Sequence, residues 1–465
     1  MPTDATPDAA AQPSSALAPA PAPEANPLPQ RPWQEIPRVP GLLPWVGPGL
    51  TLLQDPTAFF QRQRERVGET YLIESFGYRL ACVFSPAGVR NLWALPEAVA
   101  SKGLADFTML SHKVPGDLFA GRRTFPHGLF GREDVEVYLE NLNEAVALEL
   151  GAMGASGEIE AFDFCRRLAH RMGLASWGSR AATEPACLER LIRAFDTLDS
   201  SESFVHPARG IKTWATGKRR EKAALAEIEA IYDEILRSTP PLSEAEPGQP
   251  EPDFFDRIRR TWQDEPDLNK RHQGIARDVV LVHMGSQSNL FAAMAWTIVH
   301  LLERPALLEA VRAGDDALFE RCAHESIRLR QRSIVLRQIL QPCVIADEHA
   351  EYALPPGLFL ATMLSVTNVR GAEGLDQFNP DHYRGPQFKR NGELGTRELI
   401  TTFGHGKHYC PAQRFSISAM RIATRALLDH FDLEPRFKNP GPLRRQIGGV
   451  ARADRACTIR YTKRS

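Results

Sequence analysis

The chain has 465 residues, of which 43% are hydrophobic and 24% charged. This is enough apolar material for a large buried core, so wholesale disorder and a small disulfide-stapled fold are both excluded. The 56 Lys and Arg residues balance 57 Asp and Glu residues, which leaves no overall field to attract nucleic acid. Seven cysteines without a CxxC pair argue against a disulfide framework or a structural zinc site and fit a reducing compartment.

The N-terminal residues 1–32 contain nine prolines and nine alanines and almost no large apolar side chain. Such a stretch buries too little surface to offset its ordering entropy, so we expect a disordered tail there and an ordered domain over 33–465. The tail has no apolar run long enough for a signal peptide or a membrane anchor. We therefore expect a soluble, cytoplasmic protein.

The elements of the N-terminal half follow from local patterns. Pro56 in the first turn, preceded by Asp55, predicts a helix through Arg66. Short β-like runs follow, and helical patterns then dominate up to a proline-rich acidic loop. The expected strands are 70–75 and 79–84, the expected helices include 135–150 and 218–236, and the loop covers 238–253.

One long segment, 274–304, has no proline and reads as a single helix of roughly 45 Å at about 1.5 Å per residue. Between Val279 and Leu302 it carries no Lys, Arg, Asp or Glu. A membrane span is one interpretation, but the polar residues in its middle favour a helix buried at the centre of a large protein. We expect a mostly α fold with small β-sheets (α+β).

The most informative stretch is 403–412, in which Cys410 stands just ahead of a predicted helix at 416–429. Gly404 and the other glycine of the loop permit tight turns and the close approach of a flat ligand, and His408 is a donor two residues before the sulfur. A helix N-terminus favours a thiolate, and a thiolate is a strong axial ligand for haem iron. The alternative is a structural cysteine buried near a turn.

This segment resembles the haem-binding loop of cytochrome P450, whose pattern is Phe-x-x-Gly-x-x-x-Cys-x-Gly. Phe403, Gly406 and Cys410 match, and Ala412 replaces the final Gly. Further motifs follow the family's order. Glu325 and Arg328 fit its Glu-x-x-Arg helix, and 378–383 resembles its Phe-x-Pro-x-Arg-Phe segment, with His382 in place of the Arg that closes the network.

The resemblance implies the cytochrome P450 fold, an α-rich core with a long central helix over haem, and a single catalytic domain over 33–465. It implies haem b with an axial thiolate from Cys410, cofactor contacts from Phe403 and Gly404, and propionate contacts from Arg337 and His408. The family's Trp-x-x-x-Arg motif, which supplies another propionate contact, is missing here. Candidate substitutes are Arg122, Arg123 and His127, although a solvated loop is at least as good an interpretation of them.

The central helix departs from the family pattern. Monooxygenases of the family usually have Ala-Gly-x-Asp/Glu-Thr there, and its acid–alcohol pair helps to deliver protons. Here Ser288 stands at the acid position and Asn289 at the alcohol position, so both are candidate catalytic residues. Asn here is similar to sterol and bile-acid hydroxylases, prostacyclin synthase and allene oxide synthases. The alternative is that Asn289 satisfies a kink in the helix backbone.

The expected function is a monooxygenase that inserts oxygen from O2 into a lipophilic small molecule of terpenoid, steroid or acyl-chain type. Its electrons would come from a separate reductase, a ferredoxin or a flavodoxin-type donor. The rival is an isomerase or dehydratase that rearranges a lipid hydroperoxide without reductant, and a haem protein without catalysis fits less well. The resemblance places Ser286, Leu290 and Ile334 in the substrate pocket, whereas His283 is better interpreted as a core histidine.

Overall fold

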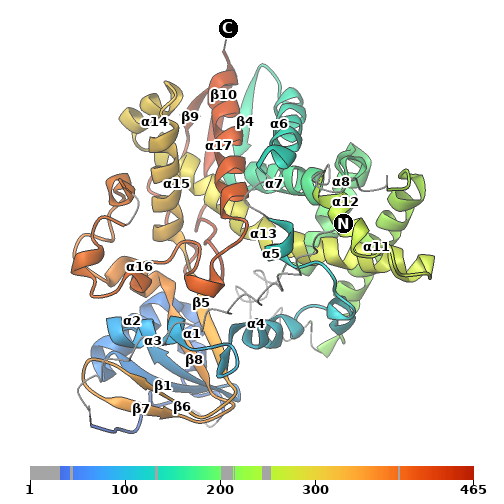
Figure 1. Ribbon diagram of the computed structural model, residues 1–465. Helices are drawn as coiled ribbons and strands as arrows, with labels where there is room; N and C mark the ends of the chain where they lie inside the picture. Colours follow the sequence, from blue (N-terminus) through green and yellow to red (C-terminus); the bar gives the residue numbers. More distant parts are fainter. Residues whose placement is uncertain are drawn as a thin grey trace, which may run out of the picture.

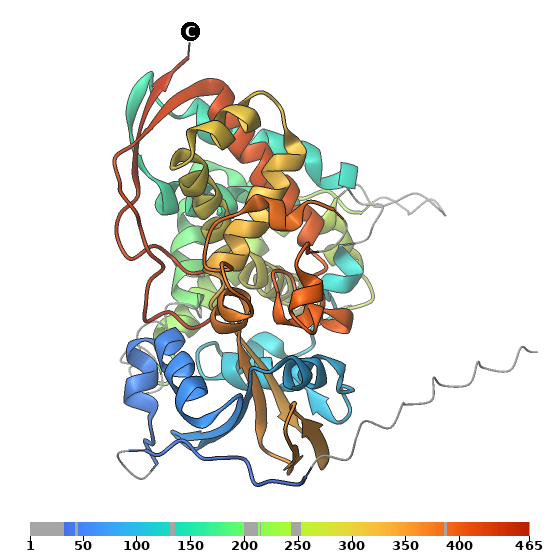
Figure 2. The same cartoon turned by 90° about the vertical axis from the view of Figure 1, so that its left-hand side faces the viewer.

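The structure is a computed structural model that describes residues 32–41, 45–130, 135–199, 213, 215–242, 253–385 and 388–464. The predicted tail lies outside the described residues except for its last proline, as do residues 243–252 of the predicted loop. The described chain consists of a smaller β-rich part and a larger helical part. In Figures 1 and 2 the β-rich part lies at the bottom and the helical part lies above it.

The larger sheet has five strands in the order β1-β2-β8-β5-β3. A hairpin joins β1 to β2, with Ser75 opposite Tyr78. The two residues between them, Phe76 and Gly77, both have positive φ, as a tight two-residue hairpin turn requires. The strands of this sheet are β1 (Thr70–Ser75), β2 (Tyr78–Val83), β3 (Ala100–Ser101), β5 (Ile334–Ile339) and β8 (Phe359–Met363).

Two smaller sheets complete the β-structure of the described residues. One has the order β4-β10-β9 and the other pairs β6 with β7. The first joins a strand from the middle of the chain to two from its C-terminal end. Their bounds are β4 (Ser156–Glu160), β6 (Cys343–Ala346), β7 (Glu351–Leu354), β9 (Phe431–Pro435) and β10 (Thr458–Lys463).

Helices make up most of the larger part and also flank the strands of the smaller part. In the described residues of both parts they are α1 (Gly49–Gln54), α2 (Pro56–Val67), α3 (Pro86–Ala94), α4 (Lys102–Ser111), α5 (Pro126–Leu129), α6 (Val135–Gly151), α7 (Ala161–Trp177), α8 (Pro185–Leu198), α11 (Arg219–Ser238), α12 (Phe254–Arg260), α13 (Leu268–Leu302), α14 (Pro305–Arg312), α15 (Asp316–Arg330), α16 (Leu364–Arg370) and α17 (Gln413–His430). Of these, α1, α2 and α3 lie beside the strands of the smaller part (Figure 1). Short 3-10 turns lie at η1 (Gly116–Phe119), η2 (Arg180–Thr183), η3 (Pro380–Tyr383), η4 (Asn391–Glu393), η5 (Arg397–Leu399) and η6 (Gly406–His408).

Helix α13 runs through the middle of the helical part (Figure 1) and packs against α7, α11 and α15. It begins six residues earlier than predicted, because the Asp267 side chain accepts hydrogen bonds from the backbone N–H groups of Asn269 and Lys270. Trp296 on this helix is fully buried, and its indole N–H donates to the Ala451 carbonyl oxygen at 2.6 Å. The prediction of a buried central helix is therefore confirmed, as is the mostly α class with small sheets.

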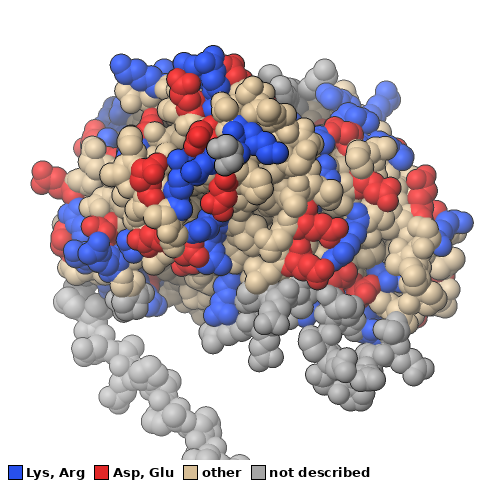
Figure 3. Space-filling model, turned by 90° about the horizontal axis from the view of Figure 1, so that it is seen from above, with Lys and Arg blue, Asp and Glu red and all other residues tan. Residues whose placement is uncertain are grey.

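The charges of the surface are mixed. On the face shown in Figure 3, Lys and Arg side chains alternate with Asp and Glu side chains over the described residues. This distribution agrees with the formal net charge of −1. None of the described helices combines the length and the apolarity that crossing a lipid bilayer would need.

Candidate active site

The cysteine loop (residues 403–410) brings Cys410 to a position just before α17. Its two ends are joined by the Cys410 N–H, which donates to the Phe403 carbonyl oxygen at 2.7 Å. Gly404 has a φ of +82°, in the left-handed region, and a Cβ there would lie 2.3 Å from the His408 carbonyl oxygen. Glycine at this position therefore allows the loop to fold back tightly behind the sulfur.

The Cys410 thiol is largely removed from water. Burial raises the pKa of the thiol, and the Ala412 backbone N–H opposes this effect only in part. We expected the nearby helix N-terminus to lower the pKa of this thiol. The pKa is raised instead, because the loss of hydration outweighs the effect of one N–H donor. A coordinated metal cation deprotonates a thiol outright. This setting suits a metal ligand better than a free nucleophile.

A cavity of about 440 Å³, which we call the thiol cavity, lies between the cysteine loop and α13. Its size is in the usual range for small-molecule and cofactor sites. The walls come from distant parts of the chain, including the loop, α13 and β5. The predicted site residues that line it are Ser286, Asn289, Leu290, Ile334, Phe403, Gly404, His408 and Cys410. The structure thus brings together most of the site residues that the sequence indicated.

One end of the thiol cavity carries basic side chains. His408 Nε2 lies 3.2 Å from the Glu97 Oε1 atom, and an Arg337 terminal nitrogen lies 3.6 Å from the same atom. Lys102 also lines the cavity and is paired with Asp106. Burial disfavours ionisation of Glu97, but hydrogen bonds from the Lys102 N–H and the Ser101 hydroxyl, together with the nearby His408 and Arg337, outweigh it and lower the pKa of Glu97. A carboxylate therefore already sits between Arg337 and His408.

Arg337 does not itself line the thiol cavity. Its Nε donates to the Ala100 carbonyl oxygen at 2.9 Å, and one terminal nitrogen donates to the Leu92 carbonyl oxygen at 2.8 Å. The side chain is fully buried and ties β5 to β3 and α3. The predicted propionate contact would therefore use the guanidinium edge that now faces Glu97.

The three basic residues considered as additional propionate partners do not line the thiol cavity. Arg123 pairs with Asp264 and lies over the Trp262 ring. Arg122 lines a second cavity of about 300 Å³, which we call the side cavity. Lys102 is the basic residue that the sequence analysis missed, because it belongs to no recognisable motif and reaches the site through the start of α4.

The side cavity adjoins the thiol cavity along α13. Both are lined by Leu281, Gly285, Asn289 and Val450. Ser288, the predicted acid-position residue, lines the side cavity and is not among the residues lining the thiol cavity. Of the two candidate catalytic residues, Ser288 therefore lines only the side cavity, whereas Asn289 lines both cavities.

The Asn289 side chain forms a hydrogen bond with the segment 448–450, which lies opposite α13. Its Oδ1 atom accepts the Val450 N–H at 3.0 Å, and the Gly449 N–H donates to the Ser333 hydroxyl at 3.0 Å. These bonds fix residues 448–450 against α13 and the segment before β5. The helix runs without interruption through Asn289, so the side chain bonds to a neighbouring segment instead of satisfying a kink in its own helix. Ser286, in contrast, donates back to the His283 carbonyl oxygen.

His283 is a core residue, in agreement with the simpler of its two interpretations. It is fully buried, accepts the Trp177 indole N–H on Nδ1 at 3.2 Å, and lies with Nε2 2.9 Å from His170 Nδ1. Because indole can only donate, the neutral His283 ring carries its proton on Nε2. Burial and the neighbouring His170 hold the pKa of His283 well below its usual value.

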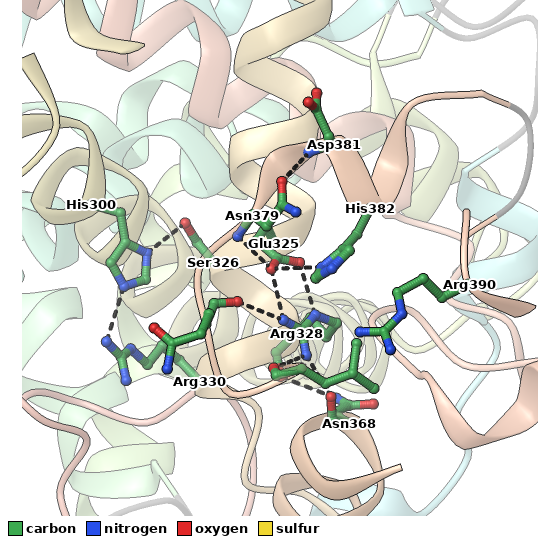
Figure 4. Close-up of polar contacts among 12 residues, drawn as sticks. His300, Glu325, Ser326, Arg328, Arg330, Asn368, Asn379, Asp381, His382 and Arg390 are labelled. Carbon is green, nitrogen blue, oxygen red and sulfur yellow. Dashed lines mark hydrogen bonds and ion pairs between the residues drawn. The ribbon is translucent and has the colours of Figure 1, made fainter. Parts of the chain in front are cut away.

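Glu325 and Arg328 form a buried ion pair on α15 (Figure 4). Both side chains have 0% exposure, and two Arg328 nitrogens donate to the two Glu325 oxygens at 2.7 and 2.8 Å. Arg328 also donates to the Leu375 carbonyl oxygen, and Glu325 accepts the Asn379 N–H at 2.9 Å. His382 Nδ1 lies 3.1 Å from Glu325 Oε1. The histidine thus occupies the third place in the network.

We expect His382→Leu to lower the free energy of unfolding by about 1–3 kcal/mol, the range for losing a hydrogen bond to a buried charged group. Glu325 keeps Arg328 and the Asn379 N–H, so the fold should survive. Urea unfolding of the purified protein measures the change, with His382→Arg, the residue of the family pattern, as the comparison. An unchanged midpoint in the leucine variant would mean that His382 contributes nothing to the network.

A thiol presented by a glycine loop, a long helix across the cavity and a buried Glu–Arg pair together define a haem-thiolate protein. The family model for cytochrome P450 matches residues 200–456, more than half of the chain, which therefore belongs to the cytochrome P450 family. It is an oxidoreductase of the monooxygenase class, and its cofactor is haem whose iron is held by a cysteine thiolate.

Similarity to individual relatives is low in identity but extends over most of the chain. Human 24-hydroxycholesterol 7-alpha-hydroxylase is 17% identical over 459 residues, covering 92% of this chain and 94% of the relative. Mouse cytochrome P450 7B1 is 20% identical, with coverages of 93% and 91%. Abscisic acid 8'-hydroxylase 3 from Oryza sativa subsp. japonica is 21% identical, with coverages of 84% and 80%.

The residues around the thiol cavity fit haem. The cavity offers a single cysteine thiol, that of Cys410, and mostly apolar side chains elsewhere. His408, which lines the cavity, and Arg337 both already face the Glu97 carboxylate, so a propionate at this end would compete with Glu97 for these two partners. Lys102 lines the same cavity and is paired with Asp106, which lines it as well.

Proposed function

We propose that this chain inserts one oxygen atom from O2 into a lipophilic small molecule, with Cys410 as the thiolate ligand of the haem iron. The electrons come from a separate protein of ferredoxin or flavodoxin type. The observation that carries the proposal is the thiol cavity, in which Cys410 faces the central helix α13 across a mostly apolar space. The relatives' names support a lipophilic substrate, because they describe hydroxylases of sterols and of abscisic acid.

The chain's own residues have distinct roles in this proposal. Haem, when bound, supplies the oxygen and electron chemistry. Phe403 and Gly404 shape the loop that holds Cys410, and His408 with Lys102 hold carboxylates at one end of the cavity. Leu290 and Ile334 exclude water from the reacting substrate, which strengthens the polar interactions inside. Asn289 keeps residues 448–450 in place and faces the reacting region.

A second candidate is the rearrangement of a lipid hydroperoxide without reductant. The observation that favours it is Asn289, which stands where the family's monooxygenases usually have an alcohol. No Asp, Glu, Lys or Arg occurs on α13 between Val279 and Leu302. An amide positions a bound oxygen atom but has no useful pKa for proton delivery. A monooxygenase with this helix has to obtain its protons through water or Ser288.

Three measurements on the haem-loaded protein test these functions, and the last two separate them. A carbon monoxide difference spectrum with the long-wavelength band of thiolate ligation establishes the Cys410–iron bond that both functions need. Product formation from a sterol or terpenoid panel, dependent on NAD(P)H and a surrogate ferredoxin system, supports oxygen insertion. Rapid consumption of a fatty-acid hydroperoxide without reductant, with no reductant-dependent product, would replace it with the second candidate.

Asn289→Ala is expected to weaken substrate binding by about tenfold, since it leaves the Val450 N–H without its acceptor and frees a segment that lines both cavities. Asn289→Asp keeps an acceptor at the same place and should stay within about threefold of the parent. The spin-state shift of the haem on substrate addition measures the affinity. Thr297→Val is the control, because the Thr297 hydroxyl bonds to the backbone of the same helix and Thr297 lines neither cavity. Equal affinities for the two Asn289 variants would contradict the anchoring role.

A further inference from the structure

The side cavity contains a cation that the proposed chemistry does not use. Arg122 follows η1 and lines this cavity opposite α13. Its Nε donates to the Thr124 carbonyl oxygen at 2.8 Å, and its guanidinium lies 4.6 Å from the centre of the Phe125 ring. Both contacts hold the side chain in one orientation without neutralising its charge. The guanidinium is thus fixed at the wall of a cavity that adjoins the thiol cavity.

No carboxylate of the described residues lies within 4 Å of the Arg122 guanidinium. Asp278 is near enough to attract it: its Oδ2 atom accepts the Thr124 N–H and the Trp262 indole N–H, both at 2.9 Å, and its Oδ1 atom is buried without a hydrogen-bond partner, so no hydrogen bond joins Asp278 to Arg122. Burial lowers the pKa of Arg122, yet an arginine stays protonated at neutral pH. Its terminal N–H groups therefore remain available to an anion in the side cavity.

The other long polar side chains of the side cavity already have partners. Gln446 donates to the carbonyl oxygens of Gly448 and Val450 and accepts the Arg452 N–H. The Arg452 guanidinium pairs with Asp199 at 3.4 Å. The remaining wall is largely apolar, with contributions from Leu110, Leu118, Phe119, Leu281, Met284 and Phe291. Arg122 is thus the polar anchor at the edge of an apolar surface.

The position of Arg122 relative to the thiol cavity gives this cation a role in substrate binding. The two cavities share Leu281, Gly285, Asn289 and Val450 in their walls, and a Cβ placed on Gly285 would meet nothing within 4 Å, so their common wall has open space at this residue. An elongated apolar molecule can therefore reach from the Cys410 side to the neighbourhood of Arg122. The volumes of about 440 and 300 Å³ have to accommodate both haem and substrate, so the side cavity adds room at the substrate end.

We propose that Arg122 binds the carboxylate of a lipophilic acid whose apolar body extends past Gly285 toward the thiol cavity. This inference rests on the proposed function and narrows its substrate class from lipophilic molecules to lipophilic carboxylic acids. A guanidinium offers two parallel N–H donors to a carboxylate, and such a pair is both strong and directional. A neutral ester or alcohol leaves the desolvated cation unpaired, so the site discriminates against it.

The test uses the haem-loaded full chain and two matched probe pairs: abscisic acid with its methyl ester, and lithocholic acid with its methyl ester. The spin-state shift of the haem reports binding of each probe. In the parent protein we expect the acid of at least one pair to bind at least tenfold more tightly than its ester. Arg122→Gln should abolish this preference, and Arg122→Lys should retain part of it. Arg123→Gln should leave it unchanged, since Arg123 pairs with Asp264 outside both cavities.

The outcomes separate this inference from the proposed function. A carbon monoxide spectrum without the thiolate band contradicts the proposed function itself. If that band is intact in every variant but the parent protein shows no preference for the acid in either pair, the role of Arg122 is overturned. The absence of any spectral shift counts as no preference. A preference for the acid over the ester that persists in Arg122→Gln also overturns the role of Arg122. An acid preference lost in both Arg122→Gln and Arg123→Gln would assign it to the positive charge of the whole segment instead of to this side cavity.

Discussion

Cys410→Ser is expected to abolish the long-wavelength carbon monoxide band and product formation while the chain stays folded. A serine hydroxyl is a far weaker ligand than a thiolate and does not promote O–O cleavage in the same way. The loop itself should persist, because it is closed by the backbone bond from the Cys410 N–H to the Phe403 carbonyl oxygen and by the backbone of Gly404. Circular dichroism and the carbon monoxide difference spectrum measure the two halves of this prediction.

The matched control is Cys187→Ser. Cys187 is half-buried on α8 and does not line the thiol cavity. Its replacement should leave the spectrum and turnover within a factor of about two, as for a surface substitution away from structural features. A Cys410→Ser protein that keeps the thiolate band would show that another cysteine holds the iron. All seven cysteines are free, so each would then have to be replaced in turn.

Several elements of the fold follow from local sequence alone. The helix after Asp55 and the strand ending at Ser75 lie where the proline and the β-branched pattern predicted them. The second strand begins one residue early, since the two-residue turn at Phe76 and Gly77 leaves Tyr78 already paired. The start of α13 was misplaced because Asp267 caps a first polar turn that the apolar pattern did not include. Capping chemistry, not hydrophobic periodicity, sets that boundary.

The site was predictable where its residues follow one another in the chain. Cys410, Gly404 and His408 belong to one short loop, and Glu325 with Arg328 to one helical turn, so spacing alone indicates their proximity. Glu97 and Lys102 could not be predicted in this way. Lys102 lines the thiol cavity and Glu97 faces His408 because β3 pairs with β5, which places the start of α4 beside the cysteine loop. Long-range pairing of this kind leaves no local pattern in the sequence.

Arg122 illustrates the same limit from the other direction. Its position in the chain alone made Arg122 a candidate substitute for the missing propionate contact. The structure places it on the far side of the Gly285–Asn289 boundary, in the side cavity. A basic residue near the right position in a sequence does not determine which cavity its side chain enters, because that depends on the packing of α13 against η1.

Arg328→Ala is expected to cost about 3–5 kcal/mol of unfolding free energy, because it leaves the Glu325 carboxylate buried without its counter-ion. The total free energy of unfolding of a protein is about 5–15 kcal/mol, so much of the variant should fail to fold or to take up haem. The control is Arg384→Ala, which removes an exposed pair of the same i, i+3 spacing with Asp381 and should cost about 0–1 kcal/mol. Urea unfolding and the yield of haem-loaded protein measure both. Equal costs would contradict a special role for the buried pair.

The pH dependence of stability tests the ionisation of Glu325 separately from its packing. Burial disfavours the charged form, but the bonds from Arg328 and His382 outweigh it and hold the pKa of Glu325 below its usual value. A carboxyl with a lowered folded-state pKa stabilises the fold fully above its unfolded pKa of about 4.3, and this contribution is lost as the pH falls through the folded value. Glu325→Gln should therefore be less stable at pH 7 and should lose less further stability between pH 5 and pH 3 than the parent does. A parallel decline in the two proteins would show that other carboxyl groups determine the acid limit and that Glu325 titrates as it does in the unfolded chain.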